Sequence, residues 1–271
     1  MRKLKELRPG EAFKFAGLNW VKLDDTEEGC FAITKDVISS VVFSNEENNN
    51  YNDSTVADFT NIDLYNLLIE HGAKAEDLLN FGRDLTADDG TTIDINSSDV
   101  VSLITCEEYR KYRKLIPAVE KERWTLTAES NHLTSNNTVK VISITGKITN
   151  RTATVASGVR PVCNINKEKE VEEMPVTEKI KKWFIDRNLD TADPKSQMLK
   201  LMEETGELAE GIAKNRPDQI KDSIGDIYVV LTGLSIQLGY SIEECIEAAY
   251  EEIKDRKGKM IDGVFVKESD L

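Results

Sequence analysis

The spacing of apolar residues changes character near residue 175. Before that point, short runs alternate apolar and polar residues, which predicts β-strands separated by turns. The clearest runs lie at residues 12–15, 19–23 and 30–34. A helical spacing over residues 56–68 interrupts them, and Gly72 is expected to cap that helix. Residues 1–165 are therefore predicted to form a mixed α+β domain.

After residue 175 the apolar residues recur every three or four positions, which predicts helices. Start signals precede them at Thr177, Asp193-Pro194, Pro217 and Ser241. Residues 176–271 are accordingly predicted to form an all-α bundle of four helices, which would be marginal alone. The nearly all-apolar stretch 227–238 offers a surface to partner subunits, so we expect a homodimer or homotetramer through these helices.

Residues 166–175 separate the two patterns. They are charged, poor in apolar residues and end in proline, as is typical of a solvated spacer. The predicted organisation is multidomain, with a mixed domain at 1–165, a linker at 166–175 and a helical domain at 176–271.

Composition limits the classes of function. The 271 residues carry 35 Lys and Arg against 49 Asp and Glu, a net charge of −14. This argues against binding to nucleic acid or an anionic membrane. No long apolar run or signal-peptide pattern is present, so a cytoplasmic protein is expected. The scattered cysteines predict neither zinc site nor disulfide framework, only reduced thiols.

The stretch 197–212 carries the most informative pattern, because on a helix it separates into an acidic face and an apolar face. The acidic face holds Lys200, Glu203, Glu204, Glu207 and Glu210. The apolar face, expected to be a core stripe, holds Met198, Leu201, Met202, Thr205, Leu208, Ala209 and Ile212. A solvated acidic face is the plain reading, although like charges one turn apart repel.

The next helical stretch, 222–236, changes that reading. It is apolar almost all round, yet Asp222 and Asp226 lie one turn apart near its start. Carboxylates are costly to bury unless they are paired or bound to metal. Acids facing each other from two antiparallel helices would form an oxygen-only cage, which suits Mg²⁺, with Mn²⁺ as a substitute.

At these residues a family resemblance becomes specific. Glu203-Glu204-x-x-Glu207, followed by Gly225-Asp226 and an apolar run, is similar to the MazG-like all-α nucleoside triphosphate pyrophosphohydrolases. The resemblance implies hydrolysis between the α and β phosphorus atoms of a nucleotide. Spacing alone predicts only a site for metal and phosphate.

The resemblance extends from about Val176 to the end of the chain and includes Trp183 and the ending 253–260. The chain departs from the family pattern at Ser223, where most members carry Glu. Asp222 lies within a turn of Asp226 and could substitute, so the number of metal ions stays open.

The predicted metal ligands are Glu204, Glu207 and Asp226, with Glu203 and Asp222 in auxiliary positions. Glu203 or Glu204 would act as general base towards a bound water. No Ser–His or Cys–His arrangement and no phosphate-binding glycine loop of the Walker type is present.

Several further side chains are expected to contact the substrate, namely Lys200, Trp183, Lys254, Arg256 and Lys257. Lys254 and Arg256 would hold the β and γ phosphates, or would simply be cations at a helix C-terminus. Lys200 would contact a phosphate or pair with Glu204. Trp183 would stack on a base or pack in the core.

The leading hypothesis is therefore a Mg²⁺-dependent nucleoside triphosphate pyrophosphohydrolase acting on a ribo- or deoxyribonucleotide. The alternative is a non-catalytic, nucleotide-sensing or oligomerising platform that displays a ligand-binding domain; an inert multimeric component is a third reading. Base and sugar preference, a signalling nucleotide as substrate, and the choice between dimer and tetramer stay open.

Residues 1–165 carry weaker signals. Trp20, the stretch 124–126 and the closing segment 158–161 resemble a domain of unknown function frequent in phage and bacterial proteins. That resemblance implies a C-type-lectin-like or formylglycine-generating-enzyme-like fold with ligand recognition by loops, the ligand being unknown. Trp20 and Trp124 are expected in the core, and Arg160 is expected to hold the closing strand through an ion pair.

Overall fold

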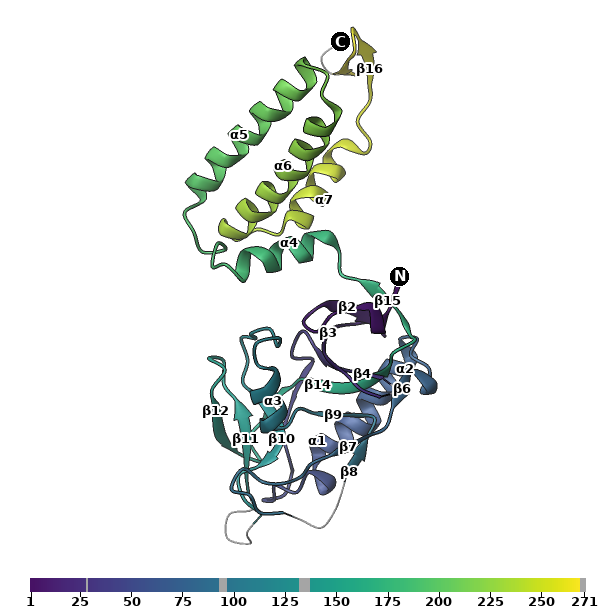
Figure 1. The fold of residues 1–271 in the computed structure, drawn as a ribbon, viewed down its shortest axis with the longest axis vertical. Helices are drawn as coiled ribbons and strands as arrows, with labels where there is room; N and C mark the ends of the chain where they lie inside the picture. The colour runs from purple at the N-terminus through teal and green to yellow at the C-terminus, as the bar shows by residue number, and fades with distance from the viewer. Residues whose placement is uncertain (28, 93–96, 132–136, 269–271) are drawn as a thin grey trace. The chain divides into compact units, whose positions relative to one another are not determined.

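The computed structural model describes residues 1–27, 29–92, 97–131 and 137–268. The chain folds into two compact units, residues 1–174 (unit 1) and 175–271 (unit 2). Strands dominate the first and helices the second (Figure 1). In the described part of the chain, no helix is both long and apolar enough to cross a membrane.

The larger sheet of unit 1 is antiparallel, in the order β1-β15-β2-β3-β4-β14-β6, with β9 also paired to β14. Its strands are β1 (Arg2–Lys3), β2 (Ala12–Phe15), β3 (Leu18–Asp25), β4 (Gly29–Thr34), β6 (Leu78–Leu79), β9 (Val101–Leu103), β14 (Pro161–Asn166) and β15 (Glu170–Glu173). Ala16 and Gly17, both at positive φ, form the tight turn between β2 and β3.

A second sheet has the order β12-β11-β10-β13-β5, and β7 and β8 form a separate ribbon. These strands are β5 (Ser39–Val41), β7 (Phe81–Arg83), β8 (Ser97–Asp99), β10 (Arg123–Ala128), β11 (Thr138–Ile142), β12 (Ile148–Thr152) and β13 (Ser157–Val159). The helical elements are η1 (Leu4–Glu6), η2 (Tyr51–Asp53), α1 (Thr55–Asp58), the π-helical η3 (Phe59–Leu64), α2 (Tyr65–Glu70), η4 (Ala75–Asp77) and α3 (Cys106–Tyr112). Gly72, at φ 93°, follows α2 as predicted.

Two tryptophans lie in the core of unit 1, as predicted, and both are fully buried. The indole N–H of Trp20 donates to the Phe15 carbonyl at 3.0 Å, and that of Trp124 donates to the Val41 carbonyl at 2.8 Å. Each ring therefore adds apolar contact area without leaving a buried donor unpaired.

The ion pair predicted for Arg160 is wrong. The buried guanidinium donates to the backbone carbonyls of Thr34, Lys35 and Pro117 at 2.7–2.8 Å. Burial, and then the charge of Arg123, lowers the pKa of Arg160. The closing strand is thus held by neutral acceptors, which a sequence pattern does not reveal.

The predicted linker is also wrong, because its residues 166–174 belong to unit 1. Residues 170–173 form β15, which pairs with β1 and β2 and buries Val171. Backbone hydrogen bonds to strands at the start of the chain hold this segment, and its glutamates point to solvent. A charged composition therefore concealed a strand with a distant partner.

Unit 2 contains α4 (Val176–Ile185), α5 (Pro194–Ala213), α6 (Pro217–Gln237) and α7 (Ile242–Ile253). Asp193 caps α5 by accepting a hydrogen bond from the Lys195 amide, and prolines open both α5 and α6, as predicted. Thr177, predicted as an N-cap, instead lies inside α4, where its hydroxyl bonds the Tyr228 hydroxyl at 2.7 Å.

The prediction that unit 2 is all-α is wrong because a hairpin follows α7. Strands β16 (Gly258–Ile261) and β17 (Val264–Lys267) pair through a tight turn at Asp262-Gly263, both at positive φ. Asp-Gly between apolar residues is a strong hairpin signal, and here it favours a hairpin over a further helix after α7.

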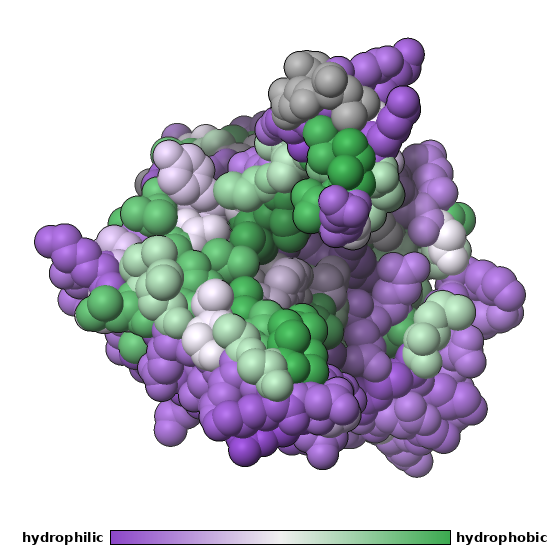
Figure 2. All heavy atoms as spheres, turned by 90° about the horizontal axis from the view of Figure 1, so that it is seen from above, coloured by the Kyte–Doolittle hydropathy of each residue, from purple (hydrophilic) through white to green (hydrophobic). Residues whose placement is uncertain are grey.

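The apolar face of α5 was predicted as a core stripe, and the structure exposes most of it. Met198, Met202, Thr205, Ala209 and Ile212, together called the outer stripe of α5, are all exposed. Further exposed apolar side chains on unit 2 are Ile224, Leu231, Leu238, Ile246, Tyr250, Ile253, Met260, Ile261, Val264 and Phe265. Figure 2 looks onto the end that carries the hairpin and shows apolar side chains gathered at the surface beside hydrophilic ones.

Candidate active site

Helices α5 and α6 run antiparallel and pack together in Figure 1. Gly211 permits their close approach, because a Cβ at this position would lie 3.2 Å from Cγ1 of Ile220. Near this contact Gln219 of α6 links the two helices, because its Nε2 donates to the Glu207 carbonyl of α5 at 3.0 Å. Glu204 and Gly211 are the buried positions of α5, and Leu201 and Leu208 beside them are half-buried, so the side that meets α6 lies on the border between the acidic and apolar faces.

Glu204 is the acid that this packing buries, with 4% of its surface exposed. Its Oε1 pairs with Lys200 Nζ at 2.7 Å, whereas its Oε2 is buried without a hydrogen-bond partner. Lys200 also reaches Oε1 of Glu203 at 3.1 Å, and the bonds to Glu204 and Glu203 raise the pKa of Lys200. One oxygen of a buried carboxylate is therefore available to a ligand.

Asp226 lies on the facing side of α6 and is partly buried. Burial raises the pKa of Asp226, and the charges of Glu204 and then Asp222 raise it further, against a lowering effect of Lys200. Acids from two helices are thus close enough to repel one another. A cation between them would relieve that repulsion.

The predicted acids are not equally placed. Glu203, Glu207 and Asp222 are exposed, whereas Glu204 is buried and Asp226 is partly buried. Across the described ranges, no group of three or more His, Cys, Asp or Glu side chains is gathered closely enough to hold a metal ion. The facing acids alone therefore do not make a complete cage, and the ligand set stays a prediction.

Two of the predicted phosphate-binding cations form ion pairs with nearby glutamates. Lys254 pairs with Glu251 at 2.6 Å and Arg256 pairs with Glu252 at 2.7 Å, within and just after α7. Lys257 is exposed. For residues the structure describes, no ion pair links these three to the acids of α5 or α6. Their arrangement fits the alternative reading, a set of cations near a helix C-terminus.

The Trp183 ring is not buried in a core, but neighbouring side chains already contact it. Its ring is 46% exposed, packs edge-on against Phe184 at 5.3 Å between centroids, and has the Arg187 guanidinium over it at 4.3 Å. A base that stacks on this ring would compete with Arg187 for its face.

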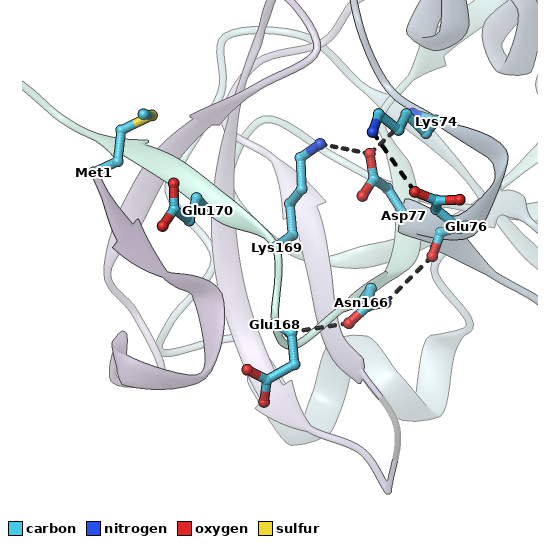
Figure 3. Close-up of a pocket in the computed structure, with 8 residues that line it drawn as sticks. All are labelled: Met1, Lys74, Glu76, Asp77, Asn166, Glu168, Lys169 and Glu170. Atoms are coloured by element: carbon cyan, nitrogen blue, oxygen red, sulfur yellow. Dashed lines mark hydrogen bonds and ion pairs between the residues drawn. The ribbon is translucent and has the colours of Figure 1, made fainter.

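Unit 1 has an open groove of about 600 Å³. Its lining consists of Met1, Lys74, Glu76, Asp77, Asn166, Glu168, Lys169 and Glu170 (Figure 3). Lys169 pairs with Asp77 at 2.5 Å and Lys74 with Glu76 at 3.7 Å. These charges satisfy one another and join the turn before β15 to η4. Ligand recognition by unit 1 stays a prediction.

Comparison with known proteins finds a similarity over part of unit 2. Residues 192–261, which span α5, α6, α7 and β16, match the model of the MazG nucleotide pyrophosphohydrolase domain. The chain is 56% identical over 59 residues to an uncharacterized 18.2 kDa protein in the rep-hol intergenic region of Haemophilus phage HP1. That match covers 21% of this chain and 36% of the phage protein. No solved structure matches the chain.

In the sequence, Ser223 stands out only as a missing acid, and the pattern gives its hydroxyl no role. The structure buries this hydroxyl without a hydrogen-bond partner. A serine three residues before Asp226, on a helix expected to be buried, was the available signal.

Proposed function

We propose that unit 2 is the catalytic part of a Mg²⁺-dependent enzyme that hydrolyses a nucleoside triphosphate to the monophosphate and pyrophosphate. The observation that carries the proposal is the placement of Glu204 and Asp226 on facing sides of α5 and α6. Both lie inside the segment that matches the MazG nucleotide pyrophosphohydrolase domain.

The donors present fit a hard divalent cation. They are carboxylate oxygens, the ligands that Mg²⁺ and Mn²⁺ prefer, and Oε2 of Glu204 is buried and unpartnered. Glu204, Glu207 and Asp226 would hold the cation, with Asp222 as an auxiliary ligand. When bound, the cation would neutralise phosphate charge and lower the pKa of a water.

The side chains around the acids supply the remaining functions. Glu203 is exposed beside Glu204, so it would be the group that takes a proton from a water at the edge of the site. Lys200 holds one oxygen of Glu204 and leaves its long side chain half in solvent, from where it can reach a phosphate.

The direct test is a panel of ribo- and deoxyribonucleoside triphosphates incubated with the full chain and Mg²⁺, with pyrophosphate as the readout. Pyrophosphate release from at least one nucleotide, abolished by a chelator and restored by Mn²⁺, is the expected result. Absence of release across the panel with both metals rejects the enzyme.

Glu204→Gln should lower kcat/KM by at least about 100-fold, on the order of 2.7 kcal/mol, because it removes the buried anionic ligand. Glu210→Gln is the matched control. Glu210 lies on the same helix face but pairs with Lys214 at the far end, so activity should stay near that of the unsubstituted chain. Equal activity of both variants would move the site elsewhere.

A second candidate function is nucleotide binding without turnover. The absence of a three-acid group among the described residues favours it. Calorimetry would then show nucleotide binding with no pyrophosphate formed.

We also propose that unit 2 assembles into a homodimer or homotetramer. Among its described residues, the only large apolar side chains that are buried are Phe184, Val230 and Ile242. The outer stripe of α5 is exposed, and so are Met260, Ile261, Val264 and Phe265 of β16–β17. Apolar surface of this extent supports a partner subunit.

A further inference from the structure

Oε2 of Glu204 on α5 and Oγ of Ser223 on α6 are buried oxygens without hydrogen-bond partners, and a third, Oε1 of Gln237, lies at the far end of α6. Glu204 and Ser223 are 4% and 1% exposed. A buried polar atom that makes no hydrogen bond loses its solvation without compensation, so such atoms in folded proteins point to a function or an unfilled ligand position.

Other hydroxyls on these helices behave differently. Thr205 donates to the Leu201 carbonyl, Thr232 donates to the Tyr228 carbonyl, and Ser235 donates to the Thr232 carbonyl. Each thereby satisfies its hydroxyl within its own helix. Ser223 makes no such bond, although the same geometry is open to any serine in a helix. Its hydroxyl is left for something outside α6.

The register of the helices places Ser223 beside the acids. Gly211 of α5 lies against Ile220 of α6. Because the helices are antiparallel, Glu204, seven residues before Gly211, meets α6 about 10 Å further along, near Ile227. Ser223 lies between Ile220 and Ile227, one turn before Asp226, on the side of α6 that is buried.

We propose that Ser223 is a positioning residue of the cation site, whose hydroxyl holds a water of a hydrated divalent cation carried by Glu204 and Asp226. The inference rests on the proposed function. Serine is too short to replace a carboxylate, but Mg²⁺ keeps several waters and needs only one or two carboxylates from a protein. A hydroxyl both donates and accepts, so it can fix such a water and complete a site in which acids are too few.

The test measures Mn²⁺ binding to the full chain without nucleotide, by the loss of the free-ion electron paramagnetic resonance signal. Ser223→Ala should weaken binding about 10-fold, as loss of outer-shell hydrogen bonds does in other metal sites. Ser223→Thr keeps the hydroxyl and should retain the affinity. Ser235→Ala is the matched control, because its hydroxyl is bonded within α6, and it should bind Mn²⁺ unchanged.

The outcomes separate the inference from the proposed function. If the unsubstituted chain neither binds Mn²⁺ nor releases pyrophosphate, the proposed function fails. If it does both and Ser223→Ala binds Mn²⁺ equally well, the role of Ser223 is overturned and the function stands. Equal weakening in Ser223→Ala and Ser235→Ala also overturns it. Should Ser223→Ala not fold, Ser223→Thr decides, since a folded Thr variant that loses affinity contradicts the proposal.

Discussion

At the scale of single residues, the close packing of α5 on α6 at Gly211 determines the environment of Glu204 in unit 2. Gly211 lets α5 approach α6 closely on the side that carries Glu204, so Glu204 is desolvated and only partly neutralised by Lys200. The sequence predicted that the acids of α5 share one helix face, because carboxylates at one-turn spacing do so. It did not predict their unequal burial, which depends on how the two helices rotate about their axes.

The raised pKa of Asp226 gives a pH-dependent prediction. Its charged form is disfavoured in the folded, metal-free chain, so its contribution to stability is most favourable below the unfolded value of 3.8 and is lost as pH rises through the folded pKa. Asp226→Asn should therefore raise the melting temperature in the presence of chelator, by a margin that grows with pH over that window and then levels off.

Thermal melts of both chains from pH 4 to pH 8, with chelator and then with Mn²⁺, check this. Added Mn²⁺ should reverse the order, since only the carboxylate gains a ligand. An asparagine variant that melts lower than the unsubstituted chain at pH 8 with chelator would contradict the repulsion between the two helices.

At the scale of elements, helix ends were predictable and partners were not. Asp193-Pro194, Pro217 and Ser241 mark helix starts through local chemistry, and the structure confirms each. Strand β15 was missed because its partners, β1 and β2, lie at the other end of the chain. The β16–β17 hairpin was not predicted, although Asp262-Gly263 is a hairpin turn signal. The family resemblance favoured helices up to the end of the chain.

The contact between α4 and α6 yields a prediction of its own. Gly233 lies under the Phe184 ring, and a Cβ there would come within 2.1 Å of a ring carbon. Gly233→Ala should therefore lower the free energy of unfolding by about 1–3 kcal/mol through overpacking. Gly225→Ala, on the same helix with nothing within 4 Å of its Cβ, is the control and should be neutral or stabilising by up to about 1 kcal/mol.

Urea unfolding at equilibrium measures both variants. If Gly233→Ala unfolds at the same urea concentration as Gly225→Ala, then Phe184 does not pack on α6 as described.

At the scale of the whole molecule, the outer stripe of α5 was predicted to be buried and is exposed. Met198, Met202 and Ile212 form an amphipathic pattern that a single sequence assigns to a core. The pattern cannot tell a core within one chain from a core shared between chains. Unit 1, by contrast, buries its predicted tryptophans within its own sheets.

Met202→Glu should shift the full chain to a smaller assembly, because it places a charge in the centre of the proposed contact. Ile144→Glu is the matched control, since Ile144 is an exposed apolar residue of unit 1 and lies outside the outer stripe. Light scattering coupled to gel filtration gives the mass of each. Equal masses for all three chains would leave the outer stripe without a partner subunit.

Strand β15 ends at Glu173 and α4 begins at Val176, so two residues join the units. A truncation at residue 165, where composition places the boundary, would strip β1 and β2 of their neighbour and leave raw sheet edges prone to aggregate. Any attempt to produce either half in isolation should divide the polypeptide at the Met174-Pro175 bond, with the glutamate-rich strand left on the N-terminal fragment.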